Sequence, residues 1–130
     1  MGIKRFEDLD CWKESRVLVN MVYELTKGKD FSKDFKLRDQ IQSASVSGMS
    51  NIAEGFERDS NKDTIRFMNI SLSSVTEVQS QLYIALDQKY IANSEFKTTY
   101  EQATKVKKII NGFIRYLNQL STTKRETRNE

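Results

Sequence analysis

Residues Ser45–Phe56 read SVSGMSNIAEGF, a run of mostly small side chains that contains Gly48 and Gly55. This composition suits three structures: a phosphate-binding loop, a flexible linker, or a helix with a smooth face. A Walker loop requires GxxxxGK[ST], whereas these two glycines are seven residues apart and no Lys follows the second. Seven residues are about two helical turns, so both glycines share one helix line with Ile41 and Ala44. The stretch therefore predicts a helix whose groove lets a neighbouring helix approach closely.

The composition of the whole chain favours long helices in a single domain. The chain has 130 residues, no Pro, five Gly and one Cys. Folds rich in β-strands use Gly and Pro at their many turns, so their scarcity argues for helices. No apolar run approaches the roughly 20 residues that span a bilayer, and a lone Cys cannot form an internal disulfide. We therefore expect a soluble, cytoplasmic protein that does not associate with membranes.

Hydrophobic periodicity predicts four helices. Their expected ranges are about residues 8–27, 34–58, 61–89 and 94–120. Gly28 is placed to cap the first helix, and Ser60 with Asp63 resembles a capping box at the start of the third. Residues 121–130 are polar and charged, which predicts a flexible basic tail. Short connections then imply an all-α, antiparallel up-down-up-down four-helix bundle, with residues 1–130 as its single domain.

The residues expected to face the core step by three or four along each helix. They are Leu9, Trp12, Val19, Val22 and Leu25, with Leu18 and Met21 widening the stripe; Leu37, Ile41, Ala44, Gly48, Ile52 and Gly55; Ile65, Met68, Leu72, Val75, Gln79, Leu82 and Leu86; and Phe96, Thr99, Ala103, Val106, Ile110, Phe113, Leu117 and Leu120. A further apolar set lies beside these lines: Phe67, Ile70, Ile84, Ile109, Ile114 and Tyr116. This surplus indicates a second packing surface and hence a homo-oligomer, although isolated apolar residues on a surface are also common.

The absence of His restricts the chemistry that the protein can perform. It removes the usual general base, the commonest metal ligand and the Ser-His-Asp arrangement. The acidic turn with Glu57, Asp59 and Asp63 does not have the spacing of a calcium-binding loop. We therefore predict that the protein is not an enzyme and has no catalytic residues, no metal site and no cofactor.

Positive charge is concentrated in the C-terminal quarter. Residues 97–130 hold eight Lys or Arg against three Asp or Glu, whereas residues 1–96 hold thirteen against fifteen. On a helix, Lys97, Lys108 and Arg115 point within about 20° of one another, opposite the apolar line. With Lys105 beside them and Lys124 and Arg125 in the tail, they form a candidate nucleic-acid-binding surface. The alternative is a solvated helix face with cations favoured near its C-terminus.

Three blocks of residues resemble a known family. They are Phe6, Leu9, Trp12 and Tyr23–Thr26; then Ala44, Val46–Ser47 and Ser50–Gly55; then Phe67, Ile70, Glu77, Gln81–Leu82 and Ala85. Over about residues 6–115 the chain resembles bacterial four-helix-bundle proteins encoded within 23S ribosomal RNA intervening sequences. It departs from them at Gln42–Ser43, where members often carry a basic pair, and at Ser73–Ser74, where they often carry Gly-Ser.

The resemblance implies a four-helix bundle that assembles as a homopentamer. It also implies kinship with the accessory variability protein of diversity-generating retroelements, a basic pentamer that associates with reverse transcriptase and nucleic acid. The expected partners are therefore further copies of the chain, RNA or DNA, and by family analogy a reverse transcriptase or another protein. The alternative function is a protein-binding adaptor or assembly scaffold without nucleic-acid binding.

A structural motif accompanies the glycine line. Asn51 and Glu54 lie one turn apart on a polar line with Ser47 and Arg58. They are expected to form a network that fixes the helix register. A subunit contact or a plain exposed face are the other interpretations. Trp12 and Tyr23 could stack on bases, but their helical positions favour packing in the core.

Overall fold

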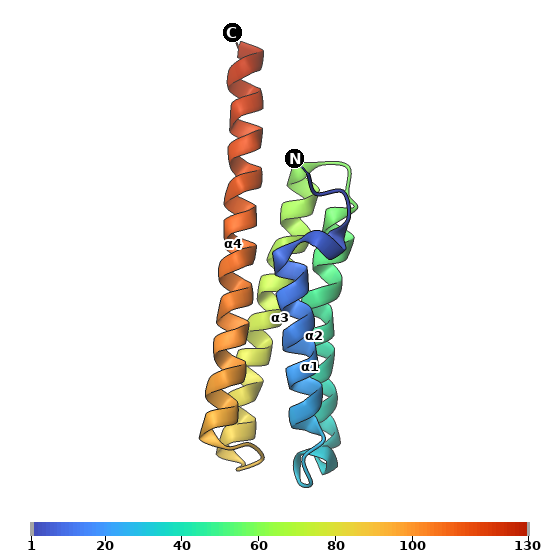
Figure 1. Ribbon diagram of the computed structural model, residues 1–130, viewed down its shortest axis with the longest axis vertical. Helices are drawn as coiled ribbons and strands as arrows, with labels where there is room; N and C mark the ends of the chain where they lie inside the picture. Colours follow the sequence, from blue (N-terminus) through green and yellow to red (C-terminus); the bar gives the residue numbers. More distant parts are fainter. Residues whose placement is uncertain (1, 130) are drawn as a thin grey trace.

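Four long helices run alternately up and down the molecule (Figure 1). In this computed structural model residues 2–129 are described, with side-chain exposure for residues 2–120. The helices are α1 (Asp10–Thr26), α2 (Phe35–Phe56), α3 (Asn61–Asp87) and α4 (Asn93–Asn129), with short 3₁₀ helices η1 (Phe6–Asp8) and η2 (Phe31–Lys33). Each long helix packs against its neighbours in sequence, and α1 also packs against α4, which closes the bundle. The predicted all-α four-helix bundle is confirmed.

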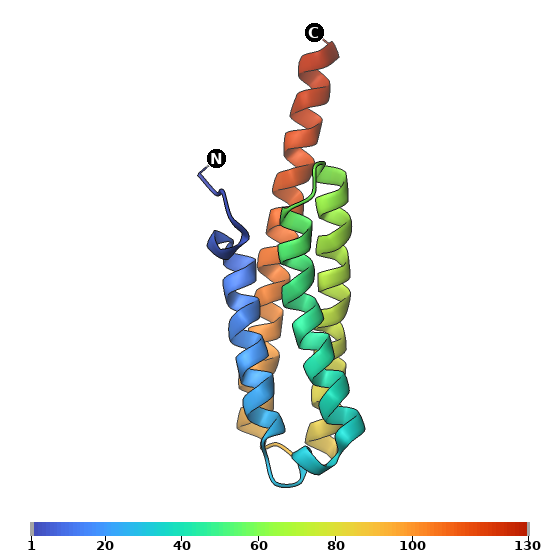
Figure 2. The same cartoon turned by 90° about the vertical axis from the view of Figure 1, so that its right-hand side faces the viewer.

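The C-terminal end of α4 differs from the expectation. We expected the helix to end near Leu120, but its backbone remains helical to Asn129 and extends past the ends of the other helices (Figures 1 and 2). Residues 121–129 contain no Gly or Pro, and Lys, Arg and Glu are good helix formers, so nothing in this sequence stops the helix. The side chains of residues 121–129, and residue 130 altogether, lie outside what the structure describes.

Three of the helix ends illustrate how far capping follows the sequence. The Ser60 side chain accepts a hydrogen bond from Asp63 N at 3.1 Å, which confirms the predicted cap of α3. Gly28 does not adopt the left-handed conformation of a capping glycine; the described glycines all have negative φ. The left-handed capping conformation occurs at the end of α3, in a non-glycine residue, Lys89, with φ 63°. There Tyr90 N donates to Ala85 O at 2.9 Å, which is the hydrogen bond of a Schellman motif.

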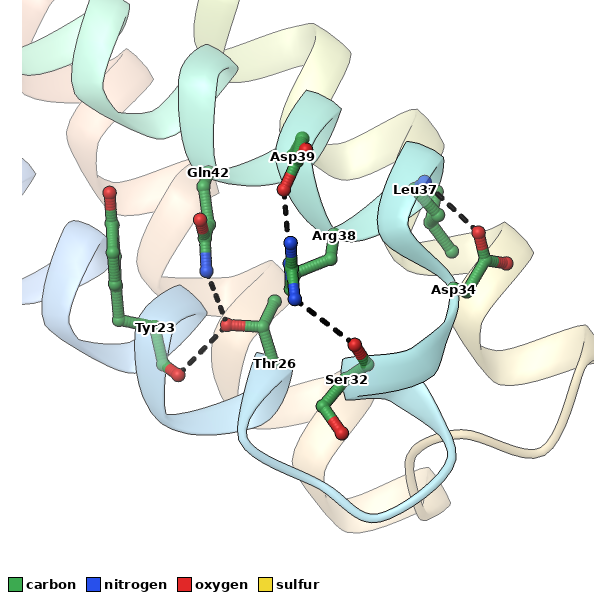
Figure 3. Close-up of polar contacts among 8 residues, drawn as sticks. All are labelled: Tyr23, Thr26, Ser32, Asp34, Leu37, Arg38, Asp39 and Gln42. Atoms are coloured by element: carbon green, nitrogen blue, oxygen red, sulfur yellow. Dashed lines mark hydrogen bonds and ion pairs between the residues drawn. The ribbon is translucent and has the colours of Figure 1, made fainter.

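The α1–α2 connection is an ordered turn rather than a loose loop. Arg38 Nη1 donates to Ser32 O at 3.1 Å, and Gln42 Nε2 donates to Thr26 Oγ1 at 2.9 Å (Figure 3). The amide of Gln42 thus ties α2 to the end of α1 at one of the positions where the chain departs from the family pattern. Phe31, in η2 of this connection, has no exposed surface and stacks on Tyr90 with 5.3 Å between ring centroids.

The core confirms the predicted lines of α2 and most of those of α3 and α4, but α1 is rotated. Its buried residues are Cys11, Ser15, Leu18, Val22 and Thr26, whereas Trp12, Val19 and Leu25 are only half-buried. The prediction was right for Leu9, Leu18 and Val22. It was wrong for the three half-buried residues, because small and hydroxyl side chains occupy part of the buried face. Ser15 and Thr26 can be buried because each hydroxyl donates to a backbone carbonyl within its own helix.

The glycine line of α2 packs against hydroxyl side chains of α3. Ser71 Oγ donates to Gly48 O at 2.6 Å, and Thr64 Oγ1 donates to Gly55 O at 2.8 Å. A Cβ added at Gly55 would lie 2.8 Å from the Cβ of Phe67, so only a glycine fits there. The smooth groove predicted for SVSGMSNIAEGF is therefore present, and α3 occupies it.

Candidate nucleic-acid interface

Lys97, Lys108 and Arg115 lie exposed on the outer face of α4. The opposite face carries Ala103, Val106 and Ile110, which have no exposed surface. The three cations span roughly 27 Å along the helix axis at 1.5 Å per residue. No ion pair of these three side chains occurs among the described residues, so their charges face solvent without a neutralising partner.

Lys105 belongs to a different contact. Its Nζ lies 3.3 Å from Oε1 of Glu14 on α1. Gln102 Nε2 also donates to that oxygen, at 3.0 Å, and to the carbonyl of the same residue. These two donors, first the amide and then the ammonium, lower the pKa of the Glu14 carboxyl. Lys105 therefore joins α4 to α1 and adds less charge to the outer face than its sequence position indicated.

Lys107 is a cation that the sequence analysis did not select. Its Nζ donates to Gln79 Oε1 at 3.1 Å, while Gln79 Nε2 donates to Thr104 Oγ1 at 3.0 Å. Gln79 is the one polar residue in the expected core line of α3, and this interruption was the signal that a polar partner was needed. The side of α4 that faces α3 thus also carries a positive charge.

Lys124 and Arg125 lie on the part of α4 that extends beyond the bundle, and their side chains are outside the described residues.

Asn51 takes part in the expected polar network, but Glu54 does not. Asn51 Nδ2 donates to Ser47 O at 2.8 Å and to Ser47 Oγ at 3.1 Å. Ser47 Oγ in turn lies 2.8 Å from Ser74 Oγ on α3. Glu54 is exposed, and no hydrogen bond or ion pair of its carboxylate occurs within the described part of the chain. The network therefore links α2 to α3 through hydroxyl groups, which are too small to produce a clear pattern in the sequence.

Trp12 is half-buried at the start of α1. Its ring meets Phe6 edge-to-face at 5.2 Å, and the guanidinium of Arg16 lies 5.9 Å from its centroid. The indole thus holds η1 against the bundle, as the packing interpretation expected.

Cys11 does not have the environment of a catalytic nucleophile. Its side chain is 2% exposed, and burial raises the pKa of the thiol to about 11. Reactive thiols are accessible and have a lowered pKa, so the burial of Cys11 indicates a packing role.

The fold and this surface define an all-α four-helix-bundle protein with an exposed basic face on its last helix. The chain belongs to the 23S rRNA-intervening sequence protein family, whose sequence model matches residues 7–112. This match confirms the family resemblance that was inferred from the three blocks of residues, including Ser50–Gly55.

One solved structure supports the fold. It is a protein of unknown function from the S23 ribosomal protein family of Bacteroides thetaiotaomicron, which superposes with a TM-score of 0.75 at 23% identity. The match covers 80% of this chain and 97% of that chain. A comparison with curated proteins found no match. Among the described residues, none of the helices is apolar over a length that could cross a membrane.

Proposed function

We propose that this protein is a non-enzymatic, cytoplasmic homo-oligomer that binds RNA or DNA through the outer face of α4. The observation that carries the proposal is the line of three exposed cations, Lys97, Lys108 and Arg115, none of which forms an ion pair within the described part of the chain. Phosphate oxygens are the natural partners of such a line, because each contact releases a condensed counterion. The absence of His from the sequence and the burial of Cys11 support a non-enzymatic role.

Replacing the three cations together tests the interface. We expect Lys97→Gln, Lys108→Gln and Arg115→Gln in one chain to weaken binding of a labelled single-stranded RNA by at least about tenfold at about 50 mM salt. The slope of log K against log salt should become shallower by about two, since single strands contribute roughly 0.7 per phosphate contact. Fluorescence anisotropy at several salt concentrations measures both quantities.

The matched control replaces Lys29, Lys33 and Lys36, which are exposed near the η2 turn, with Gln. It changes the net charge by the same amount outside α4, at the turn that lies at the end of the bundle where α4 begins (Figure 1). Equal losses in both triple variants would show that only overall charge matters, and no binding by the unmodified chain at about 50 mM salt would refute the proposal.

Self-association is supported by apolar side chains that the bundle leaves exposed. Ile70 and Ile84 are 38% and 46% exposed on α3, and Val46 is 39% exposed on α2. Fewer apolar side chains are exposed than the sequence indicated, because Phe67 is buried and Ile109 and Ile114 pack against the core. Oligomerisation remains our proposal, and a pentamer is the number that the resemblance implies.

Analytical ultracentrifugation at micromolar concentration tests the assembly. We expect a species several times the chain mass of 15.1 kDa, near five times that mass for a pentamer. The exposed apolar side chains are the reason, since burying them between copies is favourable by about 25 cal/mol per Å². A single species of the chain mass would contradict the proposal.

A protein-binding scaffold is the alternative that the same apolar residues favour. A reverse transcriptase or another protein would then take the place of nucleic acid. Elution from heparin and the ratio of absorbance at 260 and 280 nm after purification distinguish the two functions. Nucleic acid that co-purifies supports the first, and a protein that ignores heparin supports the second.

A further inference from the structure

An exposed aromatic cluster lies where the end of α3 meets the start of α4. Tyr83 on α3 is 4.8 Å from Phe96 and 5.8 Å from Tyr100, measured between ring centroids. Phe96 and Tyr100, one turn apart on α4, lie 5.4 Å from each other with 30° between their planes. The three rings therefore form one contiguous group that joins the two helices.

Tyr83 is the most exposed of the paired aromatic rings among the described residues. Phe31, which stacks on Tyr90, has no exposed surface, whereas Tyr83 is 50% exposed. Phe96 and Tyr100 are each half-buried. A ring that served only to join α3 to α4 would gain from deeper burial, so half of the Tyr83 side chain is available to another molecule.

Positive charges border the cluster. Lys97 follows Phe96 directly in α4 and is exposed. Lys107, two turns beyond Tyr100, lies on the same side of α4, since it donates to Gln79, one turn before Tyr83 on α3. Lys97 also begins the outer line that continues through Lys108 and Arg115, about 60° around the helix from Tyr100.

Three carboxylates also lie close by in sequence. Asp87 is one turn after Tyr83, Glu95 directly precedes Phe96, and Glu101 follows Tyr100. All three are exposed, and none forms an ion pair with the neighbouring lysines in the described part of the chain. They limit the local positive potential without neutralising the lysines.

We propose that Tyr83, with Phe96 and Tyr100 behind it, is a base-stacking subsite for single-stranded nucleic acid whose phosphates follow Lys97, Lys108 and Arg115. Aromatic rings beside a basic groove are the combination by which proteins hold single strands, because every base offers a π-face. In a duplex the bases are stacked on one another, so their faces cannot reach Tyr83. The inference rests on the proposed nucleic-acid binding and adds a preference for single strands.

Tyr83→Leu tests the stacking, because it removes the aromatic ring and keeps an apolar side chain against Phe96 and Tyr100. The probe is a single strand of about 16 nucleotides that contains 2-aminopurine, whose fluorescence is quenched by stacking. We expect the variant to bind this strand about tenfold more weakly than the unmodified chain and to quench it less. Binding to a duplex of the same sequence and to heparin should change by less than about twofold.

Two control variants separate stacking from other effects. Tyr83→Phe keeps the ring and should bind the single strand as the unmodified chain does. Tyr23→Leu alters a tyrosine of similar exposure, 40%, on α1, whose ring pairs with no other aromatic ring among the described residues. It should also leave binding unchanged.

The outcomes distinguish this inference from the function on which it rests. If Tyr83→Leu binds and quenches the single strand as the unmodified chain does, the stacking subsite is wrong and the cationic interface stands. An equal loss for single strand and duplex would likewise overturn the subsite, because stacking acts on the single strand alone. If the unmodified chain binds no strand at about 50 mM salt, both proposals fail.

Discussion

A Gly55→Leu variant is expected to lose about 3 kcal/mol of unfolding free energy and to melt roughly 10 °C lower. A Cβ at this position would lie 2.8 Å from Phe67 Cβ, 3.2 Å from Met68 Cε and 3.3 Å from Thr64 O. Two of these atoms belong to the backbone or to the first side-chain carbon of α3, so they cannot move without moving the helix. The variant should also disturb the hydrogen bond from Thr64 to Gly55 O, which requires the same close approach.

Gly48→Leu should lose less unfolding free energy than Gly55→Leu. The nearest atom to a new Cβ at Gly48 is Val75 Cγ2 at 3.0 Å, which is the end of a side chain. Thermal and denaturant unfolding followed by circular dichroism measure both losses.

Gly112→Ala is the matched control for the glycine line. Gly112 lies in α4, and a Cβ there would meet only a terminal nitrogen of Arg115, at 3.7 Å, among the described residues. Alanine has a helix propensity about 1 kcal/mol better than that of glycine, so this variant should be as stable as the parent or slightly more stable. Destabilisation by Gly112→Ala equal to that of Gly55→Leu would contradict the close-packing explanation.

Phe31→Ala is expected to lower the unfolding free energy by about 3–5 kcal/mol. The ring has no exposed surface, and it stacks on Tyr90, so its removal leaves a cavity between the α1–α2 turn and the end of α3. The turn is held by bonds from Arg38 and Gln42, which limits how far it can collapse into that space. Urea unfolding provides the measurement.

Phe35→Ala is the control for this prediction. Phe35 lies four residues after Phe31, at the start of α2, and is 63% exposed. The guanidinium of Arg38 lies 4.9 Å from the centroid of its ring. We expect a loss below about 1 kcal/mol, the size of an exposed cation–π contact. Equal losses at both positions would show that Phe31 is not the anchor of the turn.

These two phenylalanines show where prediction from sequence reached its limit. Both occur in the short run KDFSKDF, which reads as a polar and aromatic connection. Nothing in the local pattern separates a ring with no exposure from one that is 63% exposed. The difference in exposure between the two rings reflects a tertiary contact. Phe31 stacks on Tyr90, which is distant in sequence and lies just after α3.

The basic face shows the same limit. The helical period placed Lys97, Lys108 and Arg115 on one outer line, and the structure leaves all three exposed. The period could not show that Lys105 would pair with Glu14 on α1 or that Lys107 would bond to Gln79 on α3. Those partners come from other helices, and their positions depend on how the helices rotate.

The sequence by itself determined four helices and the glycine line of SVSGMSNIAEGF, because helical periodicity and capping are local properties of the chain. The family followed from the resemblance of three blocks of residues. The tertiary structure decided which face of α1 is buried and that α3 fills the glycine groove. It also brought Tyr83 from α3 to Phe96 and Tyr100 on α4. Such contacts join residues on different helices, so they are fixed only when the helices pack, and no local pattern encodes them.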